Sequence, residues 1–425
     1  MDSMPSNSPG RARDDALRLV VPRALLASPE RWIEGGALLV RAGRIVEVLP
    51  NADRVRRRLE RGVRVVELAD ALLTPGLVNA HAHLELSLLR GRVARGDTFS
   101  AWIGNVLRER AAAPRGFWKS GWSLGAARAL ATGTTLVGDI DSTGAAFEAR
   151  GPRPRIRAYR EVLDAFDPRR TPAAVARLAA RPSRRARTSD AVSPHAPHTV
   201  SDALLDAVAR RARGAPTWIG VHWAETAEEG EWLERGTGPL AALLGRSPRE
   251  AGLARLARRG LLGARTALYH GNHARAEELA AIARSGATLV HCPGTHAFFT
   301  RAPVDVAAWA RRGVRVALGT DSLASNDDLD LALELARLRR AAPELAPELA
   351  WDFATRSGAR ALGFEGRAGE LRPGAFADLA VWSVDRFERR AALDALTTRA
   401  ARLDGVWLAG APVAGLPDAV RGAAW

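Results

Sequence analysis

Eight short apolar runs recur through the middle of this chain, and longer stretches rich in alanine, leucine, arginine and glutamate separate them. This alternation is typical of βαβ units, which build parallel sheets. Each run ends at an ionisable or metal-binding side chain, and the eight are His81, Asp139, Glu161, His195, His222, His270, His291 and Asp321. In a barrel of eight parallel strands, catalytic groups lie at the carboxyl ends. The sequence therefore predicts an α/β fold, the (β/α)8 TIM barrel, together with its active face.

The two ends of the chain differ from the middle, because short apolar runs there alternate with turn residues. A chain of 425 residues is also too long for a single hydrophobic core, since domains built on one core rarely exceed roughly 250–300 residues. We expect the two terminal segments to build one β-domain together and helices such as 202–213 and 274–284 to surround the barrel. The expected divisions are a disordered tail at 1–15, the β-domain at 16–74 and 366–425, and the barrel at 75–365.

The chain carries a formal net charge of +15, from 62 basic and 47 acidic residues. Such an excess suggests a nucleic-acid partner. Lys119 is the only lysine, however, so the charge is almost all arginine, scattered beside alanine and without a nucleic-acid motif. We attribute it to compositional bias and expect no nucleic-acid partner. The alternative, binding through arginine, predicts an affinity that falls steeply with salt.

Cysteine usage and hydropathy indicate the compartment. Cys292 is the only cysteine, so no intrachain disulfide can form, and a reducing compartment such as the cytoplasm is expected. The first residues are polar and lack the apolar run of a secretory signal. No segment reaches the roughly 18 uninterrupted apolar residues that span a membrane, so no membrane partner is expected.

Three motifs supply metal-binding groups. His81 and His83 lie two positions apart at a strand end, so both rings can point to one side. Two polar loop residues would explain this pair alone equally well, but the flanking PGLVNAHAHLE strengthens the metal interpretation. His222 adds a third imidazole, with Glu225 close enough to carry protons, and Asp321 adds a carboxylate. Nitrogen and oxygen ligands without thiolate suit zinc or ferrous iron.

Together these segments resemble the amidohydrolase superfamily, in the branch that contains adenosine, guanine and cytosine deaminases and chlorohydrolases. The resemblance runs through PGLVNAHAHLE, SPHAPHTVS, VHWAETAEE, YHGNHA, LGTDSLASN and GELRPGAFADLAVW, in the family's order. It implies that the terminal segments form a composite β-sandwich. It also implies one divalent ion, zinc ahead of ferrous iron, on His81, His83, His222 and Asp321. Binuclear relatives use a carboxylated lysine after strand four, whereas the only lysine here lies far off at Lys119.

The resemblance also assigns roles. Glu225 would be the general acid/base, His270 would orient the attacking water with Asp321, and His195 would contact the substrate. A divalent ion lowers the pKa of bound water from about 15.7 toward neutrality. Glu225 would deliver the proton to a ring nitrogen, hydroxide would attack the carbon that bears the amino group, and ammonia would leave. The sequence thus predicts a hydrolytic deaminase acting on a small heterocyclic substrate.

Two alternatives stay open at this point. The same residues would also support a chlorohydrolase or a cyclic amidohydrolase, because the family alone does not determine the leaving group. A catalytically inactive barrel that serves as a scaffold is the alternative of another class, and the presence of all the ligands and Glu225 argues against it. Relatives are commonly dimers, so a homodimer is compatible, but no segment marks an interface.

Further residues are candidates for substrate recognition. Glu161 would bind the polar edge of the substrate, or else pair with an arginine. His198 and His296 stand where many relatives have tyrosine and asparagine, which we interpret as a difference in specificity, with neutral variation as the alternative.

Aromatic residues near the expected barrel mouth are the last candidates. Trp102 and Phe298, with Phe99 and Phe299, would wall a flat substrate, although aromatic residues there often merely pack. The segments HCPGTHAFF and LGTDSLASNDDLD resemble aminodeoxyfutalosine deaminases most closely, which makes that nucleoside the first candidate substrate.

Overall fold

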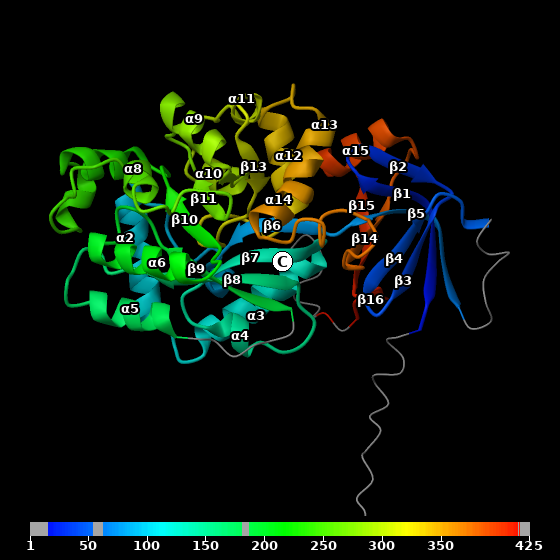
Figure 1. Ribbon diagram of the computed structural model, residues 1–425, viewed down its shortest axis with the longest axis horizontal. Coiled ribbons are helices and arrows are strands. Elements are labelled where there is room, and N and C mark those ends of the chain that lie inside the picture. The colour runs from blue at the N-terminus through cyan, green and yellow to red at the C-terminus, as the bar shows by residue number, and fades with distance from the viewer. Residues whose placement is uncertain (1–15, 54–62, 181–186, 415, 417–425) are drawn as a thin grey trace, which may run out of the picture.

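The computed structural model describes residues 16–53, 63–180, 187–414 and 416. The expected tail at 1–15 lies outside the described residues. Two bodies of secondary structure lie side by side, a barrel and a separate sheet (Figure 1). Within the described residues, no helix has both the length and the apolarity needed to cross a bilayer.

The barrel is an eight-stranded parallel sheet in which each strand pairs with the next one along the chain. Its strands are β6 (Leu77–Ala82), β7 (Thr134–Asp141), β8 (Arg155–Val162), β9 (Thr188–Pro194), β10 (Ile219–Trp223), β11 (Thr266–His270), β12 (Thr288–His291) and β13 (Arg315–Leu318). A parallel bridge between Ala82 and Asp321 nearly closes the barrel. The backbone N–H groups of Thr320 and Asp321 both donate to the His81 carbonyl. The predicted barrel is confirmed.

Glycine makes this closure sterically feasible. A Cβ atom at Gly319, directly after β13, would lie 2.8 Å from both the Cβ and the carbonyl oxygen of His81. Real Cβ contacts are essentially never that short. The Gly-Thr-Asp sequence therefore lets the chain pass close to β6 and brings Asp321 beside the first strand.

Helices surround the barrel, and short helices occupy its loops (Figure 1). They are η1 (Leu84–Leu89), α2 (Phe99–Ala112), α3 (Phe117–Ala131), α4 (Ala145–Glu148), α5 (Thr171–Ala179), α6 (Asp202–Gly214), α7 (Ala227–Gly230), η2 (Glu231–Arg235), η3 (Pro239–Ala242), α8 (Gly252–Ala257), α9 (Ala276–Ser285), α10 (Pro293–Phe298), α11 (Val306–Arg311), α12 (Leu331–Ala341), α13 (Pro347–Phe353), α14 (Arg356–Ala361) and α15 (Arg389–Thr398). The side chain of Ser201 caps α6 by accepting a hydrogen bond from the Leu204 N–H. The helices expected at 202–213 and 274–284 correspond to α6 and α9.

Both ends of the chain contribute to the second sheet, which mixes parallel and antiparallel pairs. Its strands are β1 (Arg18–Ser28), β2 (Arg31–Glu34), β3 (Ala37–Arg41), β4 (Arg44–Leu49), β5 (Arg64–Pro75), β14 (Leu379–Ser383), β15 (Arg402–Leu408) and β16 (Ala411–Pro412). Residues from β1, β3, β4, β5, β14 and β15 share one apolar core. A separate sheet built from both ends is confirmed, while the exact domain boundaries stay predictions.

The second sheet meets the barrel at the amino ends of its strands. β5 runs into β6 through Gly76, whose N–H donates to the Asp378 carbonyl. The Asp378 carboxylate pairs with Arg155 at the start of β8. These contacts lie at the opposite end of the strands from the predicted active face, so they leave that face to the barrel loops.

Candidate active site

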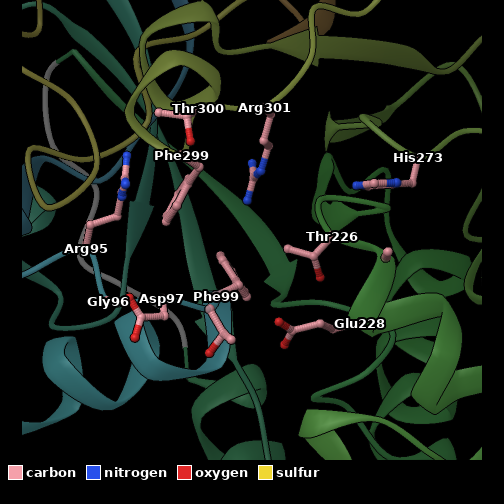
Figure 2. Close-up of a pocket in the computed structure, with 12 residues that line it drawn as sticks. Arg95, Gly96, Asp97, Phe99, Thr226, Glu228, His273, Phe299, Thr300 and Arg301 are labelled. Atoms are coloured by element: carbon pink, nitrogen blue, oxygen red, sulfur yellow. The ribbon is translucent and has the colours of Figure 1, made fainter.

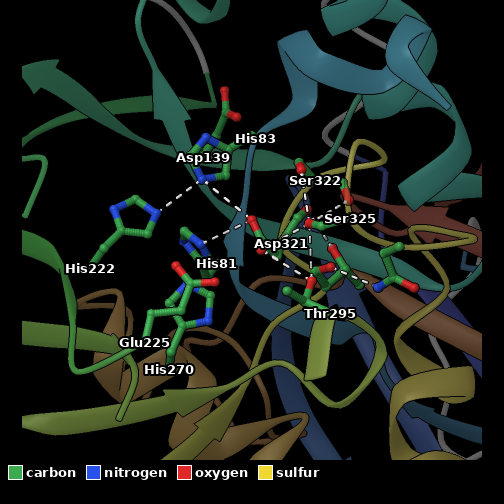
Figure 3. A network of polar contacts seen from close by, with 12 residues as sticks. His81, His83, Asp139, His222, Glu225, His270, Thr295, Asp321, Ser322 and Ser325 are labelled. Carbon is green, nitrogen blue, oxygen red and sulfur yellow. Dashed lines mark hydrogen bonds and ion pairs between the residues drawn. The ribbon is translucent and has the colours of Figure 1, made fainter. Parts of the chain in front are cut away.

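Five side chains from four strand ends converge at the carboxyl end of the barrel (Figure 3). We call them the strand-end cluster: His81, His83, His222, His270 and Asp321. One set of ligand atoms, on His81, His83 and His222, lies within 4.8 Å of one another, and so does a second set on His81, His270 and Asp321. The Nε2 atoms of His81 and His83 each lie 3.5 Å from Asp321 Oδ1. Residues more than 200 positions apart therefore form one polar cluster.

The geometry of this cluster fits a cation. His83 Nε2 and His222 Nε2 are 3.1 Å apart. The other ring nitrogen of His222, Nδ1, donates to the His195 carbonyl at 3.0 Å, so Nε2 carries a lone pair in the neutral ring. Both ring nitrogens of His81 are buried and make no hydrogen bond within the described residues. Lone pairs gathered in this way suit a divalent ion.

Burial also favours the neutral form of His83, His222 and His270, which metal ligation requires. It lowers the pKa of His222 to about 3. Burial likewise holds the pKa values of His83 and His270 well below the ordinary value. For Asp321 burial would raise the pKa, but the close approach of His81, with His83 and His270 nearby, outweighs it and holds that pKa well below its usual range. The cluster thus offers three rings held in the neutral form and one carboxylate.

Two hydroxyl groups orient the carboxylate. Thr295 Oγ1 and Ser325 Oγ donate to Asp321 Oδ2 at 3.1 and 3.2 Å. This leaves Oδ1 facing the imidazoles. Neither hydroxyl was singled out from the sequence, because Thr295 lies in the short helix α10 and Ser325 on a loop, and both contact the Asp321 carboxylate only in the folded chain.

The backbone at the cluster adopts conformations that side-chain-bearing residues rarely take. His270 has φ +76° and Asp321 has φ +57°, and Ala224, between His222 and Glu225, has φ +50°. Each such residue costs on the order of 1–3 kcal/mol and tends to occur at functional sites. The left-handed turns end the strands abruptly, so that these side chains turn in over the barrel mouth.

Glu225 lies beside the cluster as predicted from the sequence. Its Oε2 is 3.5 Å from His270 Nε2, and its backbone N–H donates to the Glu229 carboxylate at 2.9 Å. Arg301 contacts the other oxygen, Oε1, at 3.3 Å. Burial raises the pKa of Glu225 to about 8, against the opposing charge of Arg301. A carboxyl group that titrates near neutral pH is suited to proton transfer.

His195 and Glu161 face each other near the cluster. His195 Nδ1 shares a hydrogen bond with Thr199 Oγ1 at 2.7 Å, and its Nε2 lies 3.9 Å from Glu161 Oε1. Burial, with help from the charge of Glu85, raises the pKa of Glu161 to about 7. Both side chains are therefore placed where a polar substrate edge could bind, and their roles stay predictions.

The other candidates for substrate contact lie further away. His198 is buried with its Nδ1 3.5 Å from Glu229 Oε2. Trp102 is buried and donates from Nε1 to the Ala324 carbonyl. Phe298 packs edge-on against Phe299, with 5.0 Å between ring centroids. Each of these side chains packs against or hydrogen-bonds to another residue of the fold. These contacts do not test a role in substrate binding, so the predicted roles stay predictions.

A cavity of about 430 Å³ opens next to Thr226 and Arg301, and Arg301 contacts Glu225. We call it the mouth pocket (Figure 2), and its walls include Arg95, Phe99, Thr226, Glu228, Phe299 and Arg301. Phe99 and Phe299 line it directly, whereas Trp102 packs 5.2 Å from the Phe299 ring centroid. Sequence reasoning missed Arg301, and its only signal was a charged residue two positions after Phe299.

Comparison with known proteins identifies the family. The model of the amidohydrolase family matches residues 72–413.

The chain belongs to the amidohydrolase family.

Relatives of this amidohydrolase carry deaminase names. A 5-methylthioadenosine/S-adenosylhomocysteine deaminase from Halobacterium salinarum is 33% identical over 76% of each chain. An aminodeoxyfutalosine deaminase from Deinococcus radiodurans is 30% identical over 80% of this chain and 84% of its own. A zinc-bound adenosine deaminase from Xanthomonas campestris superimposes with a TM-score of 0.75 at 28% identity, over 93% of this chain and 92% of its own. The predicted resemblance is confirmed.

Family membership and the donor set of the strand-end cluster agree. Amidohydrolase relatives and the zinc-bound structural neighbour point to a divalent metal. The orphaned nitrogens of His81 and the close approach of His83 to His222 are the features that such an ion would account for. The residues present therefore fit a divalent metal.

Proposed function

We propose that this amidohydrolase is a hydrolytic deaminase that removes ammonia from the amino-substituted ring of a purine nucleoside or base. The observation that carries the proposal is the position of the Glu225 carboxyl group, buried beside the strand-end cluster and 3.5 Å from His270 Nε2. A proton carrier next to a divalent-metal site is what hydrolysis of a ring C–N bond requires. The deaminase names of relatives that align with most of this chain support it.

In this proposal His81, His83, His222 and Asp321 would hold one divalent ion. Zinc is proposed ahead of ferrous iron, because the adenosine deaminase from Xanthomonas campestris has zinc bound. Such an ion lowers the pKa of water toward neutrality. Lys119 is the only lysine of the chain and lies in α3, so a carboxylated lysine bridging a second ion is not proposed.

The protein side chains then handle the protons. Glu225 accepts one proton from the attacking water and delivers it to a ring nitrogen of the substrate. His270, 3.5 Å from Glu225, and Asp321 orient that water toward the ring carbon. The oxygen forms a bond with this carbon, the C–N bond to the amino group breaks, and the second proton of the water leaves with ammonia. His195 and Glu161 bind the edge of the ring.

Release of ammonia from a panel of substrates tests the proposal. The zinc-loaded protein is offered adenosine, 5′-methylthioadenosine, S-adenosylhomocysteine, aminodeoxyfutalosine, guanine and cytosine. We expect ammonia from at least one purine nucleoside, with the oxo product in equal amount. Silence across the panel together with turnover of a chlorinated triazine would replace the deaminase by a chlorohydrolase.

The single cysteine is consistent with a reducing compartment. Cys292 is buried, and burial raises the pKa of its thiol well above the ordinary value. A buried neutral thiol is a poor nucleophile. We therefore assign no catalytic role to Cys292. Because a single cysteine cannot form an intrachain disulfide, we also propose a cytoplasmic enzyme.

A further inference from the structure

The mouth pocket contains a cation that the reaction above does not use. Arg301 lies on the loop after α10, and its side chain points into the pocket between Phe299 and Thr226 (Figure 2). Its guanidinium carbon lies 4.4 Å from the Phe299 ring centroid, within the range of a cation–π contact. The side chain is only 15% exposed. An arginine that is largely shielded from water at the entrance to a reaction site is stabilised by an anionic partner.

The backbone of this loop is anchored independently of the Arg301 side chain. The N–H of Arg301 donates to the His296 carbonyl at 3.2 Å, and the His296 ring donates from Nε2 to the Ala302 carbonyl at 2.5 Å. Thr300, directly before Arg301, adopts φ +51°. These contacts hold the backbone of Arg301 beside the mouth pocket.

The present partner of Arg301 matches its geometry poorly. Both Nη1 and Nη2 reach a single oxygen, Glu225 Oε1, at 3.4 and 3.3 Å. The guanidinium fork is suited to two parallel, shorter hydrogen bonds to both oxygens of a carboxylate. Glu225 also has to approach the ring nitrogen of the substrate. Arg301 consequently has donors to offer to a second carboxylate that enters through the pocket.

We propose that Arg301 recognises a carboxylate on the substrate, at the end of the molecule away from the amino-bearing ring. This inference rests on the proposed deaminase function and narrows it to purine nucleosides whose ribose 5′ substituent carries a carboxylate. The ring occupies the space over the strand-end cluster, and the substituent extends into the mouth pocket. Arg301 marks the boundary between the two, because it contacts Glu225 and lines the pocket.

Two kinds of carboxylate could pair with Arg301, and each would contact different residues of the pocket wall. Phe99 and Phe299 would flank an aromatic carboxylate, as in the benzoate end of aminodeoxyfutalosine. Asp97 and Glu228 would pair with the ammonium group of an amino acid, as in S-adenosylhomocysteine. Glu228 Oε2 is buried and has no hydrogen-bond partner within the described residues. The assay below includes both compounds.

The experiment compares kcat/KM for matched substrates in the zinc-loaded wild type and Arg301→Gln. 5′-Methylthioadenosine and S-adenosylhomocysteine are both adenosine thioethers, and only the second carries a carboxylate. For Arg301→Gln we expect the ratio of kcat/KM, carboxylated over neutral, to fall roughly 10- to 100-fold, mainly through KM, as for a lost hydrogen bond to a charged group. Any effect that passes through Glu225 is common to both substrates and cancels in this ratio. Aminodeoxyfutalosine in place of S-adenosylhomocysteine identifies which carboxylate the pocket prefers.

Two further variants serve as controls. Arg301→Lys keeps the charge without the fork, so it should recover part of the ratio. Arg312→Gln removes an exposed arginine just after α11 and should leave the ratio unchanged. A ratio that stays constant in Arg301→Gln, with equal losses on both substrates, would overturn the inference and reduce Arg301 to a neighbour of Glu225.

Measurements of nucleoside binding test this inference separately from the proposed function. Calorimetry with the zinc-loaded protein measures Kd for the same nucleosides whether or not ammonia is released. Tighter binding of the carboxylated compound that Arg301→Gln abolishes, without turnover, would support the role of Arg301 and contradict the deaminase. Equal affinity of the wild type for the carboxylated and neutral compounds would overturn the role of Arg301 even if both compounds were deaminated.

Discussion

The strand-end cluster and the mouth pocket lie next to each other and are built from different parts of the barrel. Every member of the strand-end cluster is on, or within three residues of, a strand end. The mouth pocket is lined by the loop before α2 and the first residue of α2, by the segments that follow β10 and β11, and by the loop after α10. Strand ends are fixed by the sheet, whereas loops vary freely over it. The comparison indicates that the chemistry belongs to the strands and the choice of substrate to the loops.

Glu225→Gln tests the strand side of this comparison and should have the largest effect. The amide cannot carry a proton, so turnover should fall by roughly 10²- to 10⁴-fold. The metal content should stay at the wild-type value, because Glu225 is not among the proposed ligands. Ammonia release and elemental analysis of the same preparation check both points.

A surface glutamate provides the control for this variant. Glu277→Gln changes a carboxylate that is 73% exposed on α9 and should leave activity unchanged. Undiminished turnover in Glu225→Gln would remove its role as general acid/base, and loss of the metal would instead make it a ligand.

Thr295→Val tests how the strand side depends on α10, the short helix after β12. Without the 3.1 Å hydrogen bond to Asp321 Oδ2, the carboxylate should be held less firmly. Groups that orient metal ligands typically contribute 10- to 100-fold to metal affinity or activity, so we expect a loss of roughly that size in zinc affinity. Competition with a chromogenic chelator measures it.

The matched control is another buried threonine. Thr132 lies at the end of α3 and its hydroxyl donates to backbone carbonyls. Thr132→Val should leave zinc affinity unchanged. An equal fall in both variants would mean that general destabilisation, and not the orientation of Asp321, is being measured.

Phe299→Ala tests the loop side and should have the smallest effect. It removes a wall of the mouth pocket and the ring beneath Arg301. A cation–π contact contributes about 0.5–1 kcal/mol, so KM for the carboxylated nucleoside should rise roughly two- to fivefold. The zinc content and kcat should change little. Steady-state kinetics and elemental analysis check this.

Phe387 offers an arginine–aromatic contact outside the site. The Arg23 guanidinium carbon lies 4.0 Å from its ring centroid. Phe387→Ala should leave KM unchanged, whereas a large fall in kcat for Phe299→Ala would contradict the division between strand chemistry and loop recognition.

The same division explains how much could be predicted from the sequence. The barrel, its eight strand ends and the members of the strand-end cluster were predictable, because each apolar run has the length of a strand and stops at a polar residue. His81 and Asp321 become neighbours once the barrel closes. Periodicity therefore predicts the strand ends, and the family resemblance indicates which of their side chains meet.

Loop residues carry no such periodicity. Arg301 points at Glu225 because of the fold of the loop after α10, which includes a left-handed residue at Thr300. The sequence indicated aromatic residues near the mouth, but it could not distinguish Phe99 and Phe299, which line the mouth pocket, from Trp102 packed against them. Positions like these depend on backbone geometry that no short motif encodes.

A zinc titration of the metal-stripped protein tests the central claim most directly. The protein is freed of metal with a chelator, zinc is returned in steps, and ammonia release from the best substrate of the panel is measured at each step. We predict a linear rise that stops at one zinc per chain, because the two sets of ligand atoms in the strand-end cluster share His81. Activity that is full without metal, or that keeps rising to two ions per chain, would contradict the single-metal deaminase.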